Sequence, residues 1–213
     1  MYNTILFDLD GTLTDPWRGI TNSVAYALTK FGIEVTDTRE LCKFIGPPLL
    51  DSFAEYYGFD DDQCRLAVRL YREYFRDRGI YENSVYDGVP ELLSALRGHG
   101  KRIVLATSKP EEFARIILKH FSLDVYFDLV AGASMDETRS KKADVIAYAL
   151  EKLCITDTSD VLMVGDRKHD VLGANQLGIN TVGVLYGYGD LEELRSAGAR
   201  YIAKTVNDIL NFI

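Results

Sequence analysis

Short runs of apolar residues recur along the chain and predict buried β-strands. Val, Ile and Leu fill these runs without alternating polar positions, which is typical of strands covered on both faces in a parallel sheet. Five runs are strong and the last is weaker; in chain order they are 4–8, 102–106, 129–131, 161–165, 181–185 and 201–203. From residue 88 onward, helical patterns separate them, at 89–98, 111–120, 142–153, 170–177 and 191–197. Strand alternating with helix predicts an α/β fold with a doubly wound parallel sheet, as in a Rossmann-like core.

Residues 15–84 interrupt this alternation. They show helical patterns at 20–31, 38–44, 49–57 and 62–78 and no convincing buried strand. An apolar stripe in the last pattern predicts the core of a helical domain; it consists of Leu66, Leu70, Tyr71, Tyr74 and Phe75. We therefore predict an α/β core domain of residues 1–14 and 85–213, with an all-helical domain of residues 15–84 inserted directly after the first strand.

The composition narrows the partners of the chain. Its 213 residues are 47% hydrophobic and 26% charged, ordinary fractions for a globular protein, and carry a formal net charge of −8. No apolar run approaches the ~20 residues of a membrane helix, and no Lys/Arg cluster is dense enough to hold a nucleic-acid polymer. We therefore expect no membrane and no nucleic-acid partner. Because the net charge is negative, binding of an anionic substrate would require a local group of positive charges.

Cysteine usage and the N-terminal residues indicate the compartment. The three cysteines, Cys42, Cys64 and Cys154, lack CxxC or metal-ligand spacing, and we interpret each as a small core residue. The first residues lead directly into a strand pattern, without a basic segment or an apolar signal core. Both features favour the reducing cytoplasm.

Two aspartates follow the first predicted strand, in the segment Asp8-Leu9-Asp10-Gly11-Thr12. Open α/β sheets bind ligands at the carboxyl ends of their strands, and the strand period turns Asp8 and Asp10 to the same side. Neighbouring carboxylates at the end of an apolar strand are costly unless a cation or a shared proton compensates them. The alternative is an ordinary polar turn at Asp10 and Gly11.

Polar residues also follow two strands later in the chain. Thr107 and Ser108 come after the strand at 102–106, where a hydroxyl and backbone N–H groups can hold an anion, although alone they fit a simple helix cap better. Asp166 follows the strand at 161–165 and has no capping role, whereas Asp170 also fits a plain helix cap. Three carboxylates at one point suggest a hard divalent cation, with Mg²⁺ favoured for a phosphate substrate.

A pair of lysines, Lys141 and Lys142, opens the helix pattern at 142–153. A cation at a helix N-terminus opposes the helix dipole, so a negative partner is expected nearby. Taken alone, two solvated surface lysines explain the pair better.

Four strand tips thus carry, in chain order, paired Asp, Thr, Lys and Asp, and this order resembles the haloacid dehalogenase superfamily. Within it, the chain is similar to the phosphoglycolate-phosphatase-like branch, which has a helical (C1-type) cap inserted after the first motif. The resemblance covers essentially the whole chain and rests mainly on residues 8–12 and 165–170. One departure is Ala143, which follows Lys142 where the family commonly has proline, so Lys141 stays as the alternative lysine.

The resemblance implies the catalytic roles. Asp8 is the nucleophile that forms an aspartyl-phosphate, and Asp10 protonates the leaving alcohol before taking a proton from the hydrolytic water. Thr107 and Lys142 hold the phosphoryl oxygens, and backbone N–H groups near Leu9 and Ser108 assist them.

The resemblance also implies a Mg²⁺ cofactor. Its ligands are Asp8, the backbone carbonyl of Asp10, and Asp166. Asp170 reaches the ion through water or orients its ligand shell.

The expected activity is hydrolysis of a small phosphate monoester such as phosphoglycolate, a sugar phosphate or a nucleoside monophosphate, by a monomer or dimer. Candidates for leaving-group contacts are Arg18, Lys43 and Gly46. The alternative for Arg18 and Lys43 is a solvated surface cation, and the alternative for the turn at Gly46 is a simple connection between two helices. A phosphomutase is less favoured because the first histidine is His99, far from the first motif. A nucleotidase or pyrophosphatase of the same fold stays open. A catalytically idle regulatory protein is opposed by the intact acidic residues and lysine.

Overall fold

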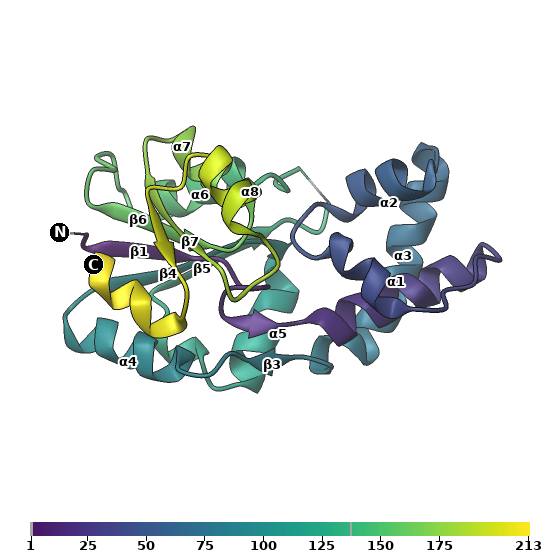
Figure 1. The fold of residues 1–213 in the computed structure, drawn as a ribbon, viewed down its shortest axis with the longest axis horizontal. Coiled ribbons are helices and arrows are strands. Elements are labelled where there is room, and N and C mark those ends of the chain that lie inside the picture. The colour runs from purple at the N-terminus through teal and green to yellow at the C-terminus, as the bar shows by residue number, and fades with distance from the viewer. Residues whose placement is uncertain (1, 137) are drawn as a thin grey trace. The chain divides into compact units, whose positions relative to one another are not determined.

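The computed structural model of the protein describes residues 2–136 and 138–213. The chain divides into two compact units (Figure 1). One consists of Met1–Asp15 with Val85–Ile213 and is called the core unit below; the other, Pro16–Ser84, is called the helical unit. None of the helices in the described ranges is both long enough and apolar enough to span a membrane.

A six-stranded parallel sheet forms the centre of the core unit, in the order β5-β4-β1-β6-β7-β8. The strands are β1 (Thr4–Phe7), β4 (Arg102–Pro110), β5 (Leu129–Ala133), β6 (Val161–Gly165), β7 (Asn180–Val184) and β8 (Tyr201–Ala203). The predicted doubly wound sheet is confirmed, the weaker last strand included. β1 pairs with β4 on one side and β6 on the other, so the strand order reverses at β1. Ligands of open α/β sheets bind at such a reversal.

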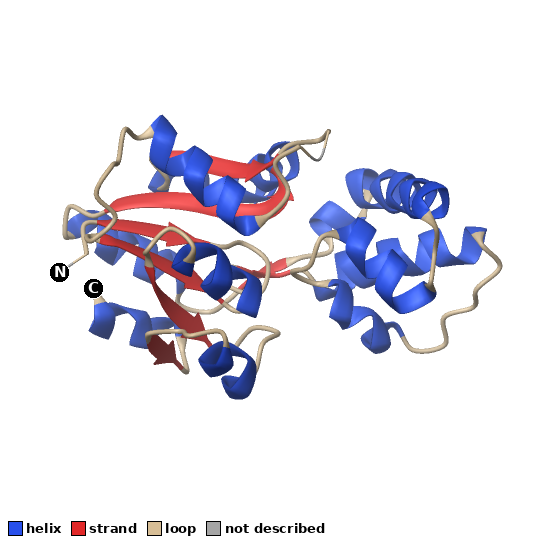
Figure 2. Cartoon of the chain, turned by 90° about the horizontal axis from the view of Figure 1, so that it is seen from above, coloured by secondary structure: helices blue, strands red, loops and turns tan. Residues whose placement is uncertain are grey.

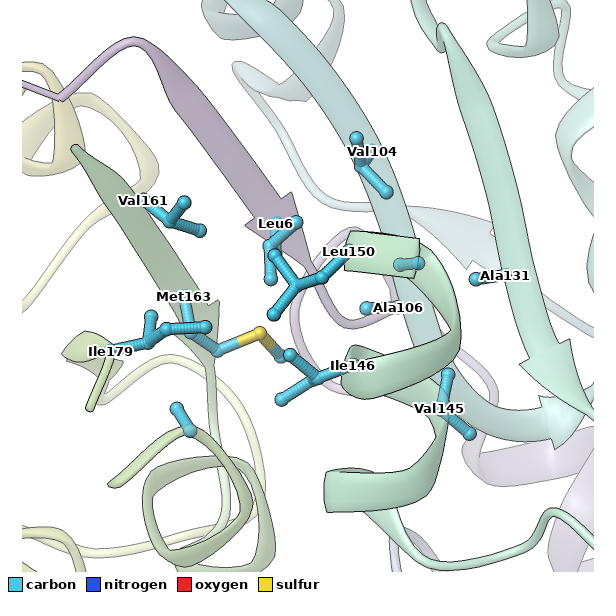
Figure 3. Packing of buried hydrophobic residues seen from close by; sticks show 12 residues of the cluster. Leu6, Val104, Ala106, Ala131, Val145, Ile146, Leu150, Val161, Met163 and Ile179 are labelled. Atoms are coloured by element: carbon cyan, nitrogen blue, oxygen red, sulfur yellow. The ribbon is translucent and has the colours of Figure 1, made fainter. Parts of the chain in front are cut away.

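Helices flank both faces of this sheet (Figure 2). They are α4 (Val89–Gly98), α5 (Glu111–His120), α6 (Lys142–Lys152), α7 (Lys168–Asn175) and α8 (Leu191–Ser196), with short 3-10 helices η3 (Asp124–Tyr126) and η4 (Val206–Phe212). Figure 3 shows how α6 is fixed: its Ile146 and Leu150 lie in one buried cluster with Leu6 of β1, Val104 of β4 and Met163 of β6. Because apolar burial holds α6 on the sheet, the position of its first residue is also fixed.

The helical unit contains every helix that the sequence predicts for residues 15–84. They are α1 (Trp17–Lys30), η1 (Thr38–Phe44), α2 (Leu49–Tyr57) and α3 (Asp61–Asp77), followed by the short η2 (Gly79–Tyr81). The segment at 38–44 is a 3-10 helix. α3 begins with a capping box, in which the Asp60 side chain accepts from the Gln63 backbone and the Gln63 side chain accepts from the Asp60 backbone. The function of this unit as a cap stays a prediction.

The apolar stripe predicted on α3 is wrong in part. Leu66 is 39% exposed, and the buried face consists of Cys64, Ala67, Val68, Tyr71 and Phe75. Residues three, four and seven positions before Tyr71 share its face of the helix, whereas Leu66, five positions before it, turns away.

The interpretation of all three cysteines as core residues is also corrected. Cys64 is buried and Cys42 is half-buried, but Cys154 is exposed. Cys154 lies just after α6 with a φ of 55°, in the turn that follows the helix, so its side chain does not enter the core.

One small element escaped the sequence patterns. β2 (Thr14–Asp15) and β3 (Ser84–Val85) form a two-stranded sheet where the chain leaves and re-enters the core unit. Strands of two residues are too short to show a period.

Candidate active site

Three buried carboxylates meet at the carboxyl ends of β1 and β6. Asp8 follows β1, Asp166 follows β6, and Asp170 lies in the first turn of α7. Each offers one oxygen, and these oxygens all lie within 4.8 Å of one another. Because β1 and β6 are parallel neighbours, their ends bring Asp8 and Asp166 to the same edge of the sheet.

Glycines permit this close approach, as Gly11 and Gly165 show. Gly11 has a φ of +81°, and a Cβ there would lie 2.1 Å from Oδ2 of Asp166. A Cβ on Gly165 would lie 2.3 Å from Cγ of Asp170. The side chains of Asp166 and Asp170 therefore occupy space that any larger residue at these positions would need.

Lys142 joins the carboxylate cluster. Its Nζ lies 2.7 Å from Oδ1 of Asp8 and 2.7 Å from Oδ1 of Asp170, and it donates a hydrogen bond to the Ala106 carbonyl at 3.0 Å. Burial lowers the pKa of Lys142, but Asp170 and Asp8 outweigh burial and raise this pKa above its usual range, so the ammonium keeps its charge. The neighbouring Lys141 is the exposed residue before the helix.

Asp170 has two partners. Its Oδ2 accepts a hydrogen bond from the Arg167 N–H at 3.0 Å, so it helps to cap α7, while its Oδ1 faces Lys142. Burial raises the pKa of Asp170 to about 6. The charge of Lys142 opposes this increase, and the charge of Asp8 adds to it. Asp170 therefore both caps α7 and belongs to the carboxylate cluster.

Asp166 is held on one side only. Its Oδ2 accepts a hydrogen bond from the Tyr188 N–H at 2.8 Å, whereas its buried Oδ1 has no hydrogen-bond partner among the described residues. Burial raises the pKa of Asp166 well above its usual range, and the charges of Asp170 and Asp8 raise it further. An uncompensated buried oxygen of this kind is a candidate ligand atom.

Asp10 pairs with a residue that the sequence analysis did not single out. Nζ of Lys109 lies 2.6 Å from Oδ2 of Asp10, and the two side chains are only 5% and 11% exposed. Burial raises the pKa of Asp10, while the charge and hydrogen bond of Lys109 lower it. The sequence signal available for Lys109 was its place directly after the hydroxyl residues that follow an apolar strand. That strand, β4, is the neighbour of β1, which the two aspartates follow.

The charge balance of the cluster fits a divalent cation. It contains four carboxylates and two ammonium groups, which leave a formal charge of −2: Asp8, Asp10, Asp166, Asp170, Lys109 and Lys142. Buried anions need compensation, and hard divalent cations take carboxylate oxygens as ligands. The three convergent oxygens and the unpaired Oδ1 of Asp166 are suited to that role.

The predicted phosphate-binding segment lies beside this cluster in the sheet. Thr107 and Ser108 belong to β4, next to β1, and the hydroxyl of buried Thr107 accepts a hydrogen bond from the Lys109 N–H at 3.2 Å. Leu9, between the two aspartates, is fully buried.

The predicted leaving-group residues belong to the helical unit. The Arg18 guanidinium lies 5.4 Å from the centre of the Trp17 ring, and Nζ of Lys43 lies 4.4 Å from that of Tyr56. Gly46 adopts a φ of 103° in the turn before α2. Their contact with a leaving group stays a prediction.

Comparison with known proteins supports the family resemblance. The family profile of haloacid dehalogenase-like hydrolases matches residues 5–184. A 5'-nucleotidase of Pseudomonas aeruginosa is 50% identical over 195 residues, which cover 92% of this chain and 88% of that protein. The crystal structure of a predicted phosphatase from Clostridium acetobutylicum has a TM-score of 0.97 and 50% identity, covering 100% of this chain and 98% of the other.

A third relative is named as a kinase and not as a phosphatase. The tyrosine-protein kinase PtkA of Mycobacterium tuberculosis is 43% identical over 185 residues, which cover 87% of this chain but only 62% of the kinase. The family profile spans most of the chain. The chain therefore belongs to the haloacid dehalogenase-like hydrolase family and is a hydrolase with phosphatases among its relatives.

Proposed function

We propose that the protein is a Mg²⁺-dependent phosphatase that hydrolyses a small phosphate monoester through an aspartyl-phosphate on Asp8. The observation that carries this proposal is the placement of Asp8, whose carboxylate lies against both the Lys142 ammonium and the carboxylates of Asp166 and Asp170. With a divalent cation bound at these carboxylates, a nucleophile in this position meets an anionic phosphate without uncompensated negative charge around it.

Each residue of the cluster has a defined task in the reaction. A carboxylate oxygen of Asp8 forms a bond to phosphorus as the bond to the leaving oxygen breaks, and Asp10 gives that oxygen a proton. Water then attacks phosphorus as the bond between phosphorus and the Asp8 oxygen breaks, and Asp10 takes the proton of the water; the products are inorganic phosphate and the free Asp8 carboxylate. Lys142 and the Thr107 hydroxyl stabilise the charge on the phosphoryl oxygens.

The metal completes the charge balance. When bound, Mg²⁺ neutralises phosphoryl charge and helps to orient the phosphate. Asp8, Asp166 and the Asp10 carbonyl would hold it, with Asp170 as a direct or water-mediated ligand.

We take the proposed substrate class from the relatives and the proposed leaving-group contacts from the helical unit. Arg18, Lys43 and Gly46 are the proposed contacts for the leaving group. The likeness to a 5'-nucleotidase makes nucleoside monophosphates the first class to test. Phosphoglycolate, sugar phosphates and pyrophosphate complete the panel.

The test is release of inorganic phosphate from this panel, with Mg²⁺ and with EDTA, using D8N as the blank. Asparagine keeps the shape of the side chain but removes the nucleophilic charge. We expect release that needs both Mg²⁺ and Asp8. Release that persists in D8N would show that Asp8 is not the nucleophile.

The same assay separates the alternatives. A phosphomutase or a kinase would move phosphate to an acceptor, so the donor would disappear without matching free phosphate. A regulatory protein would bind Mg²⁺ and its partner without turnover, and D8N would leave partner binding unchanged.

A further inference from the structure

We infer that Lys109 is a positioning residue for Asp10: its ammonium holds Oδ2 of Asp10 so that Oδ1 is directed to the leaving oxygen of the substrate. The inference rests on the proposed function, in which Asp10 carries the proton.

The two oxygens of Asp10 have different surroundings. Oδ2 accepts a hydrogen bond from Nζ of Lys109 at 2.6 Å, and both side chains are almost completely buried. Oδ1 is buried without a hydrogen-bond partner within the described part of the chain. A charge-assisted bond of this length holds Oδ2 in place. One oxygen is therefore occupied, and the other is left for the reaction.

The backbone around Lys109 is built to hold this position. Between Ala106 and Pro110, β4 advances four residues while β5 advances only two, from Ala131 to Ala133, so the intervening residues form a bulge. Within it, the Lys109 N–H donates to the Thr107 hydroxyl at 3.2 Å. Pro110 then fixes φ at −51° directly before α5. The lysine that holds Asp10 and the proposed phosphate-binding threonine thus share one constrained segment.

Lys142 and Lys109 contact different groups of the proposed reaction. Lys142 contacts Asp8, the nucleophile, whereas Lys109 contacts Asp10, the proton carrier. As the Asp8 oxygen bonds to phosphorus, the bond to the leaving oxygen breaks and the proton passes from Oδ1 of Asp10 to that oxygen. Lys109 keeps its own protons throughout.

The test compares two phosphate esters in K109M. An alkyl phosphate, the best one in the panel, needs a proton on its leaving oxygen, whereas p-nitrophenyl phosphate loses a stable anion without one. The ratio kcat/KM covers only the steps up to the aspartyl-phosphate, so it reports this proton transfer. We expect kcat/KM to fall about 10²-fold for the alkyl ester and less than about threefold for p-nitrophenyl phosphate. A purely structural role would lower both equally.

Three further variants sharpen the result. K109Q keeps a hydrogen-bond donor without the charge, so its kcat/KM should also fall more for the alkyl ester than for p-nitrophenyl phosphate, but by a smaller factor than in K109M. K109Q replaces K109M in the test if K109M does not fold. In a D10N background, K109M should change neither ester, because the group that Lys109 positions is already lost. The matched control is K101M: Lys101 is also buried and its Nζ donates to the Tyr2 carbonyl at 2.6 Å, but it lies just before β4, at the opposite end of that strand from Lys109.

Two outcomes overturn the inference: equal losses for both esters in a folded variant, or an undiminished K109M effect in the D10N background. Turnover by the wild-type protein that survives D8N overturns the proposed function instead, and this result is independent of Lys109.

Discussion

The ammonium nitrogen of Lys142 lies 2.7 Å from Oδ1 of Asp8, and both side chains are almost completely buried. Two buried ions at this distance depend on each other, because removal of one leaves the other without compensation. Lys142 also lies 2.7 Å from Asp170, so a single cation offsets charge on two of the proposed metal ligands. A single residue, Lys142, therefore affects both the stability of the metal-free protein and the proposed reaction.

Replacement of this lysine tests both consequences. We expect K142M to lower the free energy of unfolding in EDTA by about 3 kcal/mol. With Mg²⁺, its kcat/KM should fall about 10²–10³-fold, because a donor to the phosphoryl oxygens is lost. The matched control is K141M, at the exposed neighbour. Urea unfolding and phosphate release measure the two effects, and equal losses in both variants would contradict the assignment.

Binding of Mg²⁺ should weaken in acid. Burial raises the pKa of Asp170 to about 6, and a ligand carboxylate must lose its proton before it binds the metal. Below that pH, the apparent affinity for Mg²⁺ should fall by at least roughly tenfold per pH unit, because the raised pKa of Asp166 adds a second ligand proton that must be lost. Calorimetric titration from about pH 5 to 8 measures this slope. In D170N the slope should be shallower, and a flat wild-type profile would contradict the prediction.

The metal-free protein should show the opposite trend in stability. The pKa of Asp170 rises from an ordinary value of about 3.9 to about 6 on folding, so the folded state binds this proton more tightly. The stabilisation it gives is complete below about pH 4 and is lost as the pH rises through about 6.

D170N has no such proton to lose. In EDTA, its stability relative to wild type should therefore increase by roughly 2–3 kcal/mol between about pH 4 and 7. Denaturant unfolding of both proteins across this range checks the sign. Saturating Mg²⁺ is the control, because it should stabilise wild type more than the variant. A difference that is independent of pH would contradict the coupling.

The sequence predicted the parts of the site that depend on topology. Asp8 and Asp166 come directly after apolar strands, and parallel strands that are neighbours end at one edge, so their meeting needed no knowledge of side-chain positions. Lys109 was missed because its role depends on a bulge in β4, which the apolar pattern, ending at Ala106, does not show. The exposure of Leu66 was missed because its spacing of four residues from Leu70 also fits a helical period, and the pattern alone does not show that the buried face is the one that contains Tyr71.

Gly11 gives a last test, in which backbone strain and a steric clash are separated. Gly11 and Gly32 have similar φ values, +81° and +75°, but a Cβ on Gly11 would lie 2.1 Å from Oδ2 of Asp166, whereas a Cβ on Gly32 meets nothing within 4 Å. G32A should cost about 1–2 kcal/mol, the strain of a left-handed backbone alone. G11A bears the same strain and must also displace Asp166, so it should be less stable and lose Mg²⁺ binding. Urea unfolding and calorimetric titration of both variants test this. Wild-type Mg²⁺ affinity in G11A would show that the position of Asp166 does not determine metal binding.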